Sequence, residues 1–436
     1  MPGYQAYAPP PRQPFLPTKL KDSMRFFQVP ARAWWWGLIA LAVYAVCFFV
    51  SQLVAGIVMV DIMPASAGDD VYADATPSIF LVNNIAIIVE IPICILISWL
   101  FFRQGFGWLV SVVGRFRWRW FGTVLGIFAI GYVMETIAEI LLYGPEDYGL
   151  NDIQIQPYTA FMIIAIVLTT PFQCAGEEFQ SRSLLPRLIT AIVPFRWVGL
   201  ALSAVITSGL FMYMHSAADP WLNLNYFCVG MMMWWLAYRT GGIEASIAYH
   251  IVNNMFAEWM LPFTDMSGLF DRSEGTGSWI ILVFLAVELV LVLIVDMVAR
   301  NRGIVRMSAP AAETPEVVKP REWYTALAGS SVPATPKDLP RMSATTLEIP
   351  PAAWAPQGYP AQFYPPPGYP YVPAAPMYPP PYGPPEPVES PPYGPPVSVV
   401  YPPSGPPGPV GSPPYGQPEP PGHPPYGPPG PSGTVP

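Results

Sequence analysis

The chain has 436 residues, of which 52% are hydrophobic and only 11% are charged, and its mean hydropathy is +0.35. Charge this scarce cannot cover the surface of a soluble globule of this size, so the composition favours a membrane protein. The net charge of −8 comes without any basic patch, which argues against nucleic acid as a partner.

Apolar stretches long enough to cross a bilayer, at about 18 to 25 residues each, recur along the chain. Eight of them lie at residues 33–60, 79–102, 121–143, 158–180, 197–216, 221–238, 242–261 and 277–299. The first is too long and too far from Met1 for a cleaved signal peptide, so we expect it to remain as a helix. The predicted fold class is therefore all-α, a polytopic membrane protein of about eight transmembrane helices.

The loops between the predicted helices alternate in charge. The even-numbered loops and both flanking segments are basic, as with Arg103 and Arg115 in the second loop, whereas the odd-numbered loops are acidic, as with Asp69 and Asp70 in the first. Arg272 is the single basic exception, in the acidic seventh loop. Because cytoplasmic loops carry the excess of Lys and Arg, the pattern predicts a multi-pass protein of the cell membrane with both termini in the cytoplasm.

Composition divides the chain into three regions: a Pro-containing N-terminal segment at 1–32, a membrane domain at 33–300, and a Pro/Gly/Tyr-rich tail at 301–436. The tail repeats the tetrapeptide PPYG four times and holds more than half of the 59 prolines. Such a segment cannot form a packed core, so we expect it to be disordered or extended. It is a candidate site for a partner that binds Pro-rich motifs, the alternative being a solvated linker.

Ionisable residues inside the predicted helices are informative, because each costs about 2.5–3.5 kcal/mol at a helix centre. Glu135 and Glu139 are four residues apart and share one face of the third helix, where they form either a proton or ion site or a polar contact between helices. Glu258, Glu288 and Asp296 are interpreted as structural. For Asp296 the reason is that it lies close enough to the cytoplasmic end of the last helix to reach water.

Three short motifs collect the other polar residues of the membrane domain. They are GEEFQSR with Glu177, Glu178 and Arg182, FMYMH with Phe211 and His215, and HIVNN with His250 and Asn254. Glu178 and Arg182 are four residues apart with the acid first, which favours an ion pair on a helix. Glu177 is turned by about 100° from its neighbour and can point elsewhere.

Hydrolysis of a peptide bond within a bilayer needs this set of groups. A carboxylate kept from bulk water can take a proton from an attacking water, and an imidazole can orient that water. A second histidine with an asparagine can donate hydrogen bonds to the oxyanion. For each histidine taken singly, the alternative is a hydrogen-bonded residue of the core.

The order and separation of the motifs resemble the signatures EExxxR, FxxxH and HxxxN of the CPBP family, the CAAX-protease and bacteriocin-processing intramembrane enzymes, also called the Abi family. The resemblance covers about residues 158–262 and implies a polytopic α-helical endopeptidase. By position, it implies that Glu177 is the general base and that His215 is its partner in activating water. It assigns His250 and Asn254 to the oxyanion site.

The same resemblance gives Glu178 and Arg182 a supporting role, as an ion pair that fixes the helix. Members of the family often have Gly after this arginine, whereas this chain reads FQSRSLL and has Ser183 there, a departure that affects local packing. Two histidines and a carboxylate can also hold a divalent metal such as zinc in an open catalytic site, so His215 and His250 are candidate metal ligands. A mechanism without a metal uses the same residues, and both readings stay open.

The leading hypothesis is therefore an intramembrane endopeptidase acting on a membrane-bound or lipid-modified protein or peptide, with the lipid bilayer as its surroundings. One alternative is a proton- or ion-coupled transporter, motivated by Glu90, Glu135 and Glu139 in the predicted helices. Another is a membrane scaffold that acts through its Pro-rich tail.

The predicted depths of the site residues set a condition on the fold. If the fifth helix begins at Trp197, a rise of about 1.5 Å per residue carries His215 close to the outer surface, far from Glu177 at the inner end of the fourth helix. The two residues can meet if the fourth helix continues past Arg182 as a long, tilted helix. They can also meet if the segment SAADPW after His215 is re-entrant.

Overall fold

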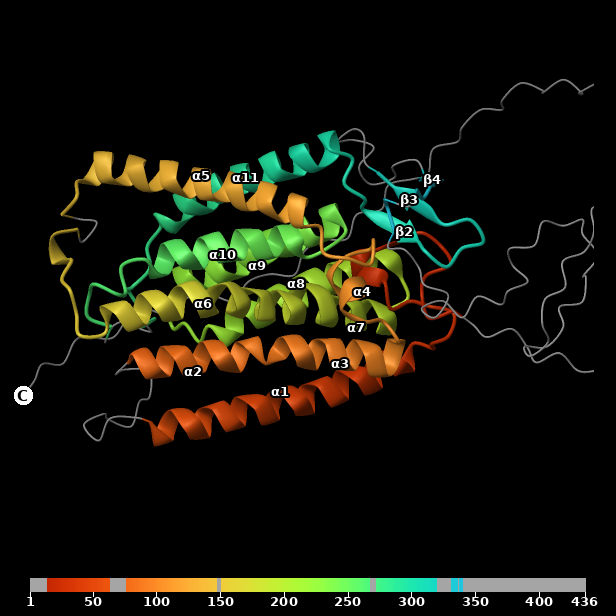
Figure 1. The fold of residues 1–436 in the computed structure, drawn as a ribbon, viewed down its shortest axis with the longest axis horizontal. Helices are drawn as coiled ribbons and strands as arrows, with labels where there is room; N and C mark the ends of the chain where they lie inside the picture. Colours follow the sequence, from red (N-terminus) through yellow and green to blue (C-terminus); the bar gives the residue numbers. More distant parts are fainter. Residues whose placement is uncertain are drawn as a thin grey trace, which may run out of the picture. The chain divides into compact units, whose positions relative to one another are not determined.

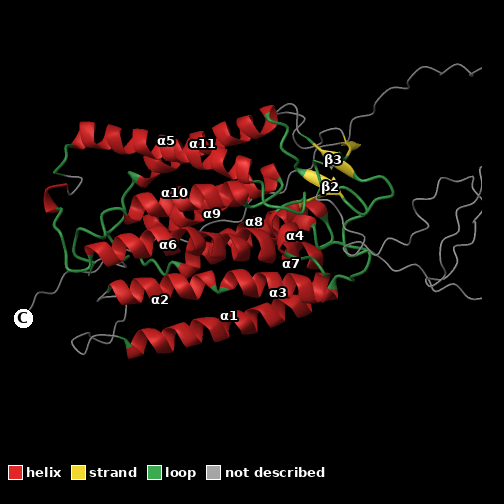
Figure 2. Ribbon diagram, viewed as in Figure 1, coloured by secondary structure: helices red, strands yellow, loops and turns green. Residues whose placement is uncertain are grey.

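The computed structural model describes residues 14–62, 76–146, 150–266, 272–319, 331–335 and 337–339. Within these residues the chain is mostly helical, and a small antiparallel sheet lies at one end of the helix bundle (Figures 1 and 2). The PPYG repeats of the tail lie outside the described residues.

Helices occupy all eight places where the sequence predicts a membrane-crossing segment. They are α1 (Trp35–Asp61), α2 (Pro77–Ile88) with α3 (Glu90–Phe102), α5 (Trp118–Tyr143), α6 (Thr159–Glu178) continued by a π-helical turn (Phe179–Leu184) and α7 (Leu185–Ile192), α8 (Arg196–Met214), α9 (Pro220–Thr240), α10 (Glu244–Glu258) and α11 (Ile281–Asn301). A short helix, α4 (Phe106–Val110), lies in the loop before α5.

Six of these segments, in the described part of the chain, are long and apolar enough to cross a membrane, and α9 and α10 are not among them. With 15 residues, α10 is about 22 Å long, which is shorter than a hydrocarbon core of about 30 Å. The protein is therefore a multi-pass, all-α membrane protein, while the predicted count of eight spans is not confirmed.

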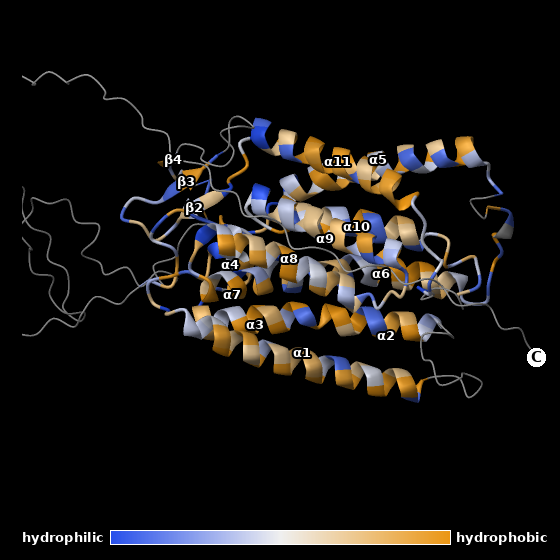
Figure 3. Ribbon diagram, turned by 180° about the vertical axis from the view of Figure 1, so that it is seen from behind, coloured by the Kyte–Doolittle hydropathy of each residue, from blue (hydrophilic) through white to orange (hydrophobic). Residues whose placement is uncertain are grey.

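The outer helices turn apolar side chains away from the bundle. Phe49 on α1 is 70% exposed and Leu141 on α5 is 80% exposed, and α1 and α11 are mostly hydrophobic along their length (Figure 3). Polar groups are paired inside instead: Glu90 accepts hydrogen bonds from Tyr44 at 3.0 Å and from Ser51 at 2.9 Å. This inside-out distribution suits a bundle surrounded by lipid.

The sheet joins the segments that flank the membrane domain. Its strands are β1 (Lys21–Asp22), β2 (Met307–Ala309), β3 (Glu316–Val318) and β4 (Ser331–Pro333), antiparallel and in that order. Because β1 precedes α1 and β2 follows α11, both flanking segments lie on one side of the bundle. The chain therefore enters and leaves the helix bundle at the same end (Figure 1).

The strands also correct the predicted start of the disordered tail at residue 301. Val317 is fully buried and packs in one cluster with Phe26 and Trp108. The high proline content of the tail as a whole hid this short apolar segment, which becomes stable only through contacts with residues almost 300 positions away.

The close approach of α6 to α2 depends on Gly176, which directly precedes the paired glutamates. A Cβ at this position would lie 2.3 Å from the carbonyl oxygen of Ile87, a backbone atom that cannot rotate away. We expect Gly176→Ala to destabilise the protein by about 1–3 kcal/mol, the usual cost of overpacking. Thermal melting in detergent measures this loss. The matched control is Gly126→Ala on α5, where a Cβ would meet nothing within 4 Å. Equal melting temperatures of the two variants would contradict the packing argument.

Candidate active site

The long fourth helical segment brings Glu177 inside the bundle. The stretch Thr159–Ile192 forms one span of 34 residues, and Glu177 lies near its middle. The chain thus meets the first of the two conditions set by the sequence. The π-helical turn that follows Glu178 carries Arg182, and such turns are frequent at functional sites because they redirect side chains within a helix.

The two neighbouring glutamates have different environments, as their angular offset predicts. The side chain of Glu178 is completely buried, with its Oε1 atom 3.5 Å from Nη1 of Arg182 and 3.1 Å from Nδ1 of His250. The side chain of Glu177 is 17% exposed, and its Oε2 atom is 3.8 Å from Nε2 of His250. One imidazole ring therefore lies between the two carboxylates.

This arrangement fixes the tautomer of His250. An ionised carboxylate only accepts hydrogen bonds, so Nδ1 of His250 carries the proton that is donated to Glu178. In the neutral ring, Nε2 then presents its lone pair toward Glu177. The ion pair with Arg182 keeps Glu178 charged for this role.

Phe211 forms a wall shared by the three motifs. Its ring centroid is 4.6 Å from that of His215 and 5.7 Å from that of His250. The guanidinium carbon of Arg182 lies over the same ring, 4.4 Å from its centre, in a cation–π contact. Residues from α6–α7, α8 and α10 thus meet around one aromatic side chain.

His215 directly follows α8 and is held from three directions. Its Nδ1 atom is 2.7 Å from the carbonyl oxygen of Phe211, its ring stacks on Tyr226 at 3.9 Å, and Arg272 donates a hydrogen bond to its carbonyl oxygen at 2.9 Å. Glu177 acts on His215 electrostatically. Arg272 is the basic exception of the seventh loop, and that exception was the one signal in the sequence pointing to it.

Gln173 connects the first and third motifs, and sequence reasoning missed it. Its Nε2 atom donates to Oε1 of Glu177 at 2.5 Å, and its Oε1 atom accepts from Nδ2 of Asn254 at 3.2 Å. The spacing of four residues from Glu177 on one helix was the available signal. Glu258, interpreted from the sequence as structural, accepts from Thr170 at 2.6 Å and acts electrostatically on Glu177.

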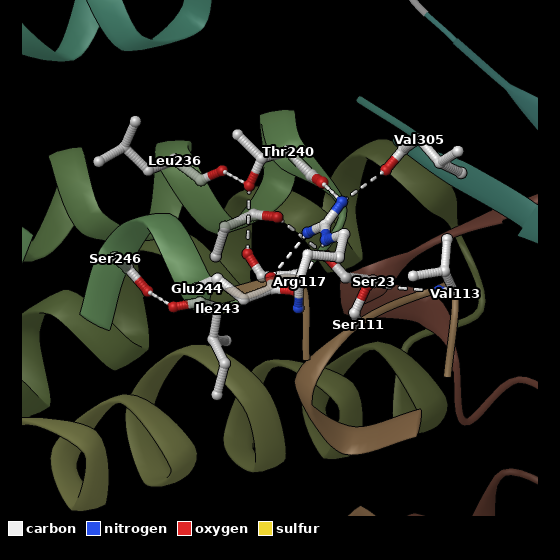
Figure 4. Close-up of polar contacts among 12 residues, drawn as sticks. Ser23, Ser111, Val113, Arg117, Leu236, Thr240, Ile243, Glu244, Ser246 and Val305 are labelled. Atoms are coloured by element: carbon white, nitrogen blue, oxygen red, sulfur yellow. Dashed lines mark hydrogen bonds and ion pairs between the residues drawn. The ribbon is translucent and has the colours of Figure 1, made fainter. Parts of the chain in front are cut away.

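An ion pair outside the motifs anchors the start of α10, the helix of His250. Arg117 binds both oxygens of Glu244, each at 2.7 Å, and donates to the carbonyl oxygens of Thr240 at 2.8 Å and Val305 at 3.2 Å (Figure 4). A carboxylate in the first turn also interacts favourably with the helix dipole. This bidentate pair fixes where α10 begins and therefore where its polar side chains lie.

The other acidic residues of the predicted helices do not join the motifs. Asp296 pairs with Arg239 at 2.7 Å and with Arg300 at 2.9 Å, and it is only 5% exposed. The interpretation that Asp296 reaches out to water is therefore wrong, because its charge is balanced inside the bundle. Glu135 on α5 lies near Glu288 of α11 rather than near Glu177.

The described residues contain no preformed metal site. In the part of the chain that the structure describes, no three His, Cys, Asp or Glu side chains are grouped so that they could hold a metal ion. Nδ1 of His215 is engaged by Phe211 and Nδ1 of His250 by Glu178, so Nε2 is the atom of each ring that a metal would bind.

Asp219 holds the turn between His215 and α9. Its Oδ1 atom accepts from the backbone N–H of Trp221 at 2.8 Å and of Leu222 at 3.0 Å, and its Oδ2 atom accepts from Gly275 at 2.9 Å. These backbone donors hold the pKa of the Asp219 carboxyl below its ordinary value.

The lowered pKa predicts an acid-dependent loss of stability. The contribution of Asp219 to the stability of the fold is complete above the ordinary carboxyl pKa of about 3.9. It is lost as the pH falls through the lowered pKa. Asp219→Asn should therefore reduce the melting temperature near neutral pH and make its decline in acid shallower, as melting at a series of pH values will show. Glu274→Gln, on an exposed position of the neighbouring loop, is the control and should change neither quantity. An Asp219→Asn profile parallel to wild type would refute the assignment.

Comparison with known proteins gives a family for this region. Residues 157–256 match the family model described as type II CAAX prenyl endopeptidase Rce1-like, which confirms the resemblance over the stretch that holds all three motifs. The uncharacterized protein YyaK of Bacillus subtilis (strain 168) is 23% identical over 202 residues, or 43% of this chain. The match spans 64% of that relative, which is less than two thirds of its length. No solved structure matches the chain.

Proposed function

We propose that the Rce1-like domain at residues 157–256 is an intramembrane endopeptidase that hydrolyses a peptide bond in a membrane-associated or lipid-modified protein or peptide. The observation that carries the proposal is the pairing of Glu177 and His250 across a gap of 3.8 Å, with His250 held from behind by the buried Glu178. A general base beside an oriented imidazole is the arrangement that water activation needs.

The gap between Glu177 and His250 suits an attacking water. At 3.8 Å, Oε2 of Glu177 and Nε2 of His250 are too far apart for a direct hydrogen bond. One water between them can donate to both, because each atom presents a lone pair. We therefore assign His250 to the water, whereas the resemblance by position gives that role to His215.

The reaction then follows from ordinary acid–base steps. The water oxygen attacks the carbonyl carbon of the substrate while Glu177 takes one of its protons. The tetrahedral intermediate collapses, the C–N bond breaks, and the proton on Glu177 passes to the leaving amine. The products are a carboxylic acid and an amine, which become a carboxylate and an ammonium group by proton transfer, so one water is consumed for each bond cleaved.

Asn254 is the candidate donor to the oxyanion. Its amide nitrogen carries two N–H groups, and one of them is donated to Gln173 at 3.2 Å. The second is the group that can stabilise the negative charge on the substrate oxygen. The short bond from Gln173 to Glu177 keeps this amide and the general base in fixed relation.

The transporter alternative loses part of its motivation, because Glu90 is bound by Tyr44 and Ser51. We also propose that the end of the bundle with the sheet is cytoplasmic in the cell membrane. The basic residues Arg103 and Arg115 belong to loops at this end, and the chain enters α1 and leaves α11 there (Figure 1).

The proposal is tested with purified protein in liposomes and a fluorogenic peptide that ends in a prenylated cysteine motif. We expect wild type to cleave it, and His250→Ala and His215→Ala to lose cleavage while they retain the wild-type circular dichroism spectrum. The same peptide without the lipid tests whether the lipid is recognised. Wild-type protein that cleaves neither peptide, or full activity in both variants, would refute the proposal.

A further inference from the structure

Hydrogen bonds lead out of the site through Asn254 and across α10. Nδ2 of Asn253 donates to Oδ1 of Asn254 at 3.1 Å. The hydroxyl of Tyr132, on α5, is 2.9 Å from Oδ1 of Asn253 and 2.7 Å from Oε1 of Glu288, on α11. Side chains of three helices therefore form one connected series that ends at the amide proposed to bind the oxyanion.

When Tyr132 donates to Asn253, every donor from Tyr132 to Gln173 points toward the site. Tyr132 donates to Asn253, Asn253 donates to Asn254, and Asn254 donates to Gln173, which in turn donates to Glu177. Hydrogen bonds aligned in one direction polarise and strengthen one another in a medium of low dielectric constant. The alignment also decides which end of the Asn254 amide faces Gln173.

The proton count at Tyr132 shows what Glu288 must supply. A phenol has a single O–H, yet two side-chain oxygens lie within hydrogen-bond distance of it. Both contacts are hydrogen bonds at the same time only if Glu288 carries a proton and donates it to Tyr132. If Glu288 is ionised, it accepts the hydrogen bond of the single Tyr132 O–H and leaves Asn253 without its donor.

The surroundings of Glu288 suit the protonated form. The residue is 7% exposed, and its Oε2 atom has no hydrogen-bond partner among the described residues. The titratable groups that face it are Tyr132 and Glu135 of α5, Tyr249 of α10 and Cys228 of α9, none of them a cation. A carboxylate here would have no charge to balance it.

We propose that Glu288, as the neutral acid, and Tyr132 are positioning residues that orient the Asn254 amide through Asn253. The proposal rests on the proposed endopeptidase function. Tyr132 and Glu288 both lie outside residues 157–256, which match the family model. Neither residue is placed against the substrate, so each acts on the chemical step through another side chain.

Tyr132→Phe is the direct test, because it removes the hydroxyl and leaves the ring packed on Phe256. We expect kcat to fall about 10- to 100-fold, the effect of misplacing a catalytic group, with KM unchanged. Asn253→Ala should show the same loss, and the double variant should lose no more than either single one, because both break one series.

Two further variants separate orientation from general damage to the core. Glu288→Gln keeps a hydrogen-bond donor toward Tyr132 and should therefore retain kcat near neutral pH. It should also remove any decline in kcat at alkaline pH that comes from ionisation of Glu288. Tyr238→Phe removes another buried phenol hydroxyl, one that bonds Arg306 and lies outside the series, and it should leave kcat and KM unchanged.

The outcomes distinguish this proposal from the one on which it rests. Three results would each overturn the positioning role while cleavage by wild type still supports the endopeptidase. They are an unchanged kcat in Tyr132→Phe, equal losses of kcat in Tyr132→Phe and Tyr238→Phe, and a loss in Glu288→Gln as large as in Tyr132→Phe. Absence of cleavage by wild type itself would instead refute the endopeptidase.

Discussion

Replacement of Glu177 by Gln should lower kcat by about 10²- to 10⁴-fold, the range that general base catalysis contributes. The amide keeps the shape of the side chain, and its oxygen can still accept the hydrogen bond from Gln173. It cannot take a proton from water. Because the side chain is 17% exposed and has no bonded cation, loss of its charge should change the melting temperature little. Cleavage assays and melting curves on one preparation measure both quantities.

Glu135→Gln is the matched control for Glu177→Gln. It makes the same chemical change on a membrane helix, at a residue that the structure places near Glu288 and away from the three motifs. Its kcat should equal that of wild type. Retained cleavage in Glu177→Gln would contradict the proposed general base. A loss restricted to Glu135→Gln would favour the proton- or ion-coupled function considered from the sequence.

Hydropathy was sufficient to locate the helices because a span has to be apolar over its whole length. The first predicted stretch, 33–60, differs from α1 (Trp35–Asp61) by no more than two residues at either end. Helical spacing likewise paired Glu178 with Arg182, since residues four apart share a face. Local patterns of this kind need no knowledge of the tertiary structure.

The parts that could not be predicted depend on contacts between distant residues. Arg117 and Glu244 are 127 positions apart, and neither belongs to a recognisable motif. Tyr132 and Glu288 meet only because α5 and α11 pack beside α10, and no pattern in the sequence distinguishes Asn253 from other polar residues. The strand at Glu316–Val318 was hidden for the same reason, since its buried Val317 packs on Phe26, which precedes α1.

Arg182→Met should destabilise the protein by about 3–5 kcal/mol, the cost of breaking a buried ion pair from one side. Both side chains of the pair with Glu178 are completely buried, so removal of the cation leaves a carboxylate without water or counter-charge. The free energy of unfolding or the melting temperature in detergent measures this loss. Cleavage should fall as well, because an uncompensated Glu178 takes up a proton and no longer fixes the tautomer of His250.

Two controls make the Arg182 prediction specific. Arg300→Met also breaks an ion pair between residues four apart, but Arg300 is 17% exposed and its partner Asp296 keeps its bond to Arg239. The loss of stability should therefore stay below about 1 kcal/mol. The double variant Glu178→Gln with Arg182→Met has neither charge of this buried pair and should recover much of the stability that Arg182→Met loses. It should also regain part of the activity, since the Gln oxygen can still accept from Nδ1 of His250. If Arg182→Met were as stable as Arg300→Met, the buried charge of Glu178 would not depend on Arg182. The hydrogen bond to His250 would then be the contact that keeps Glu178 in place.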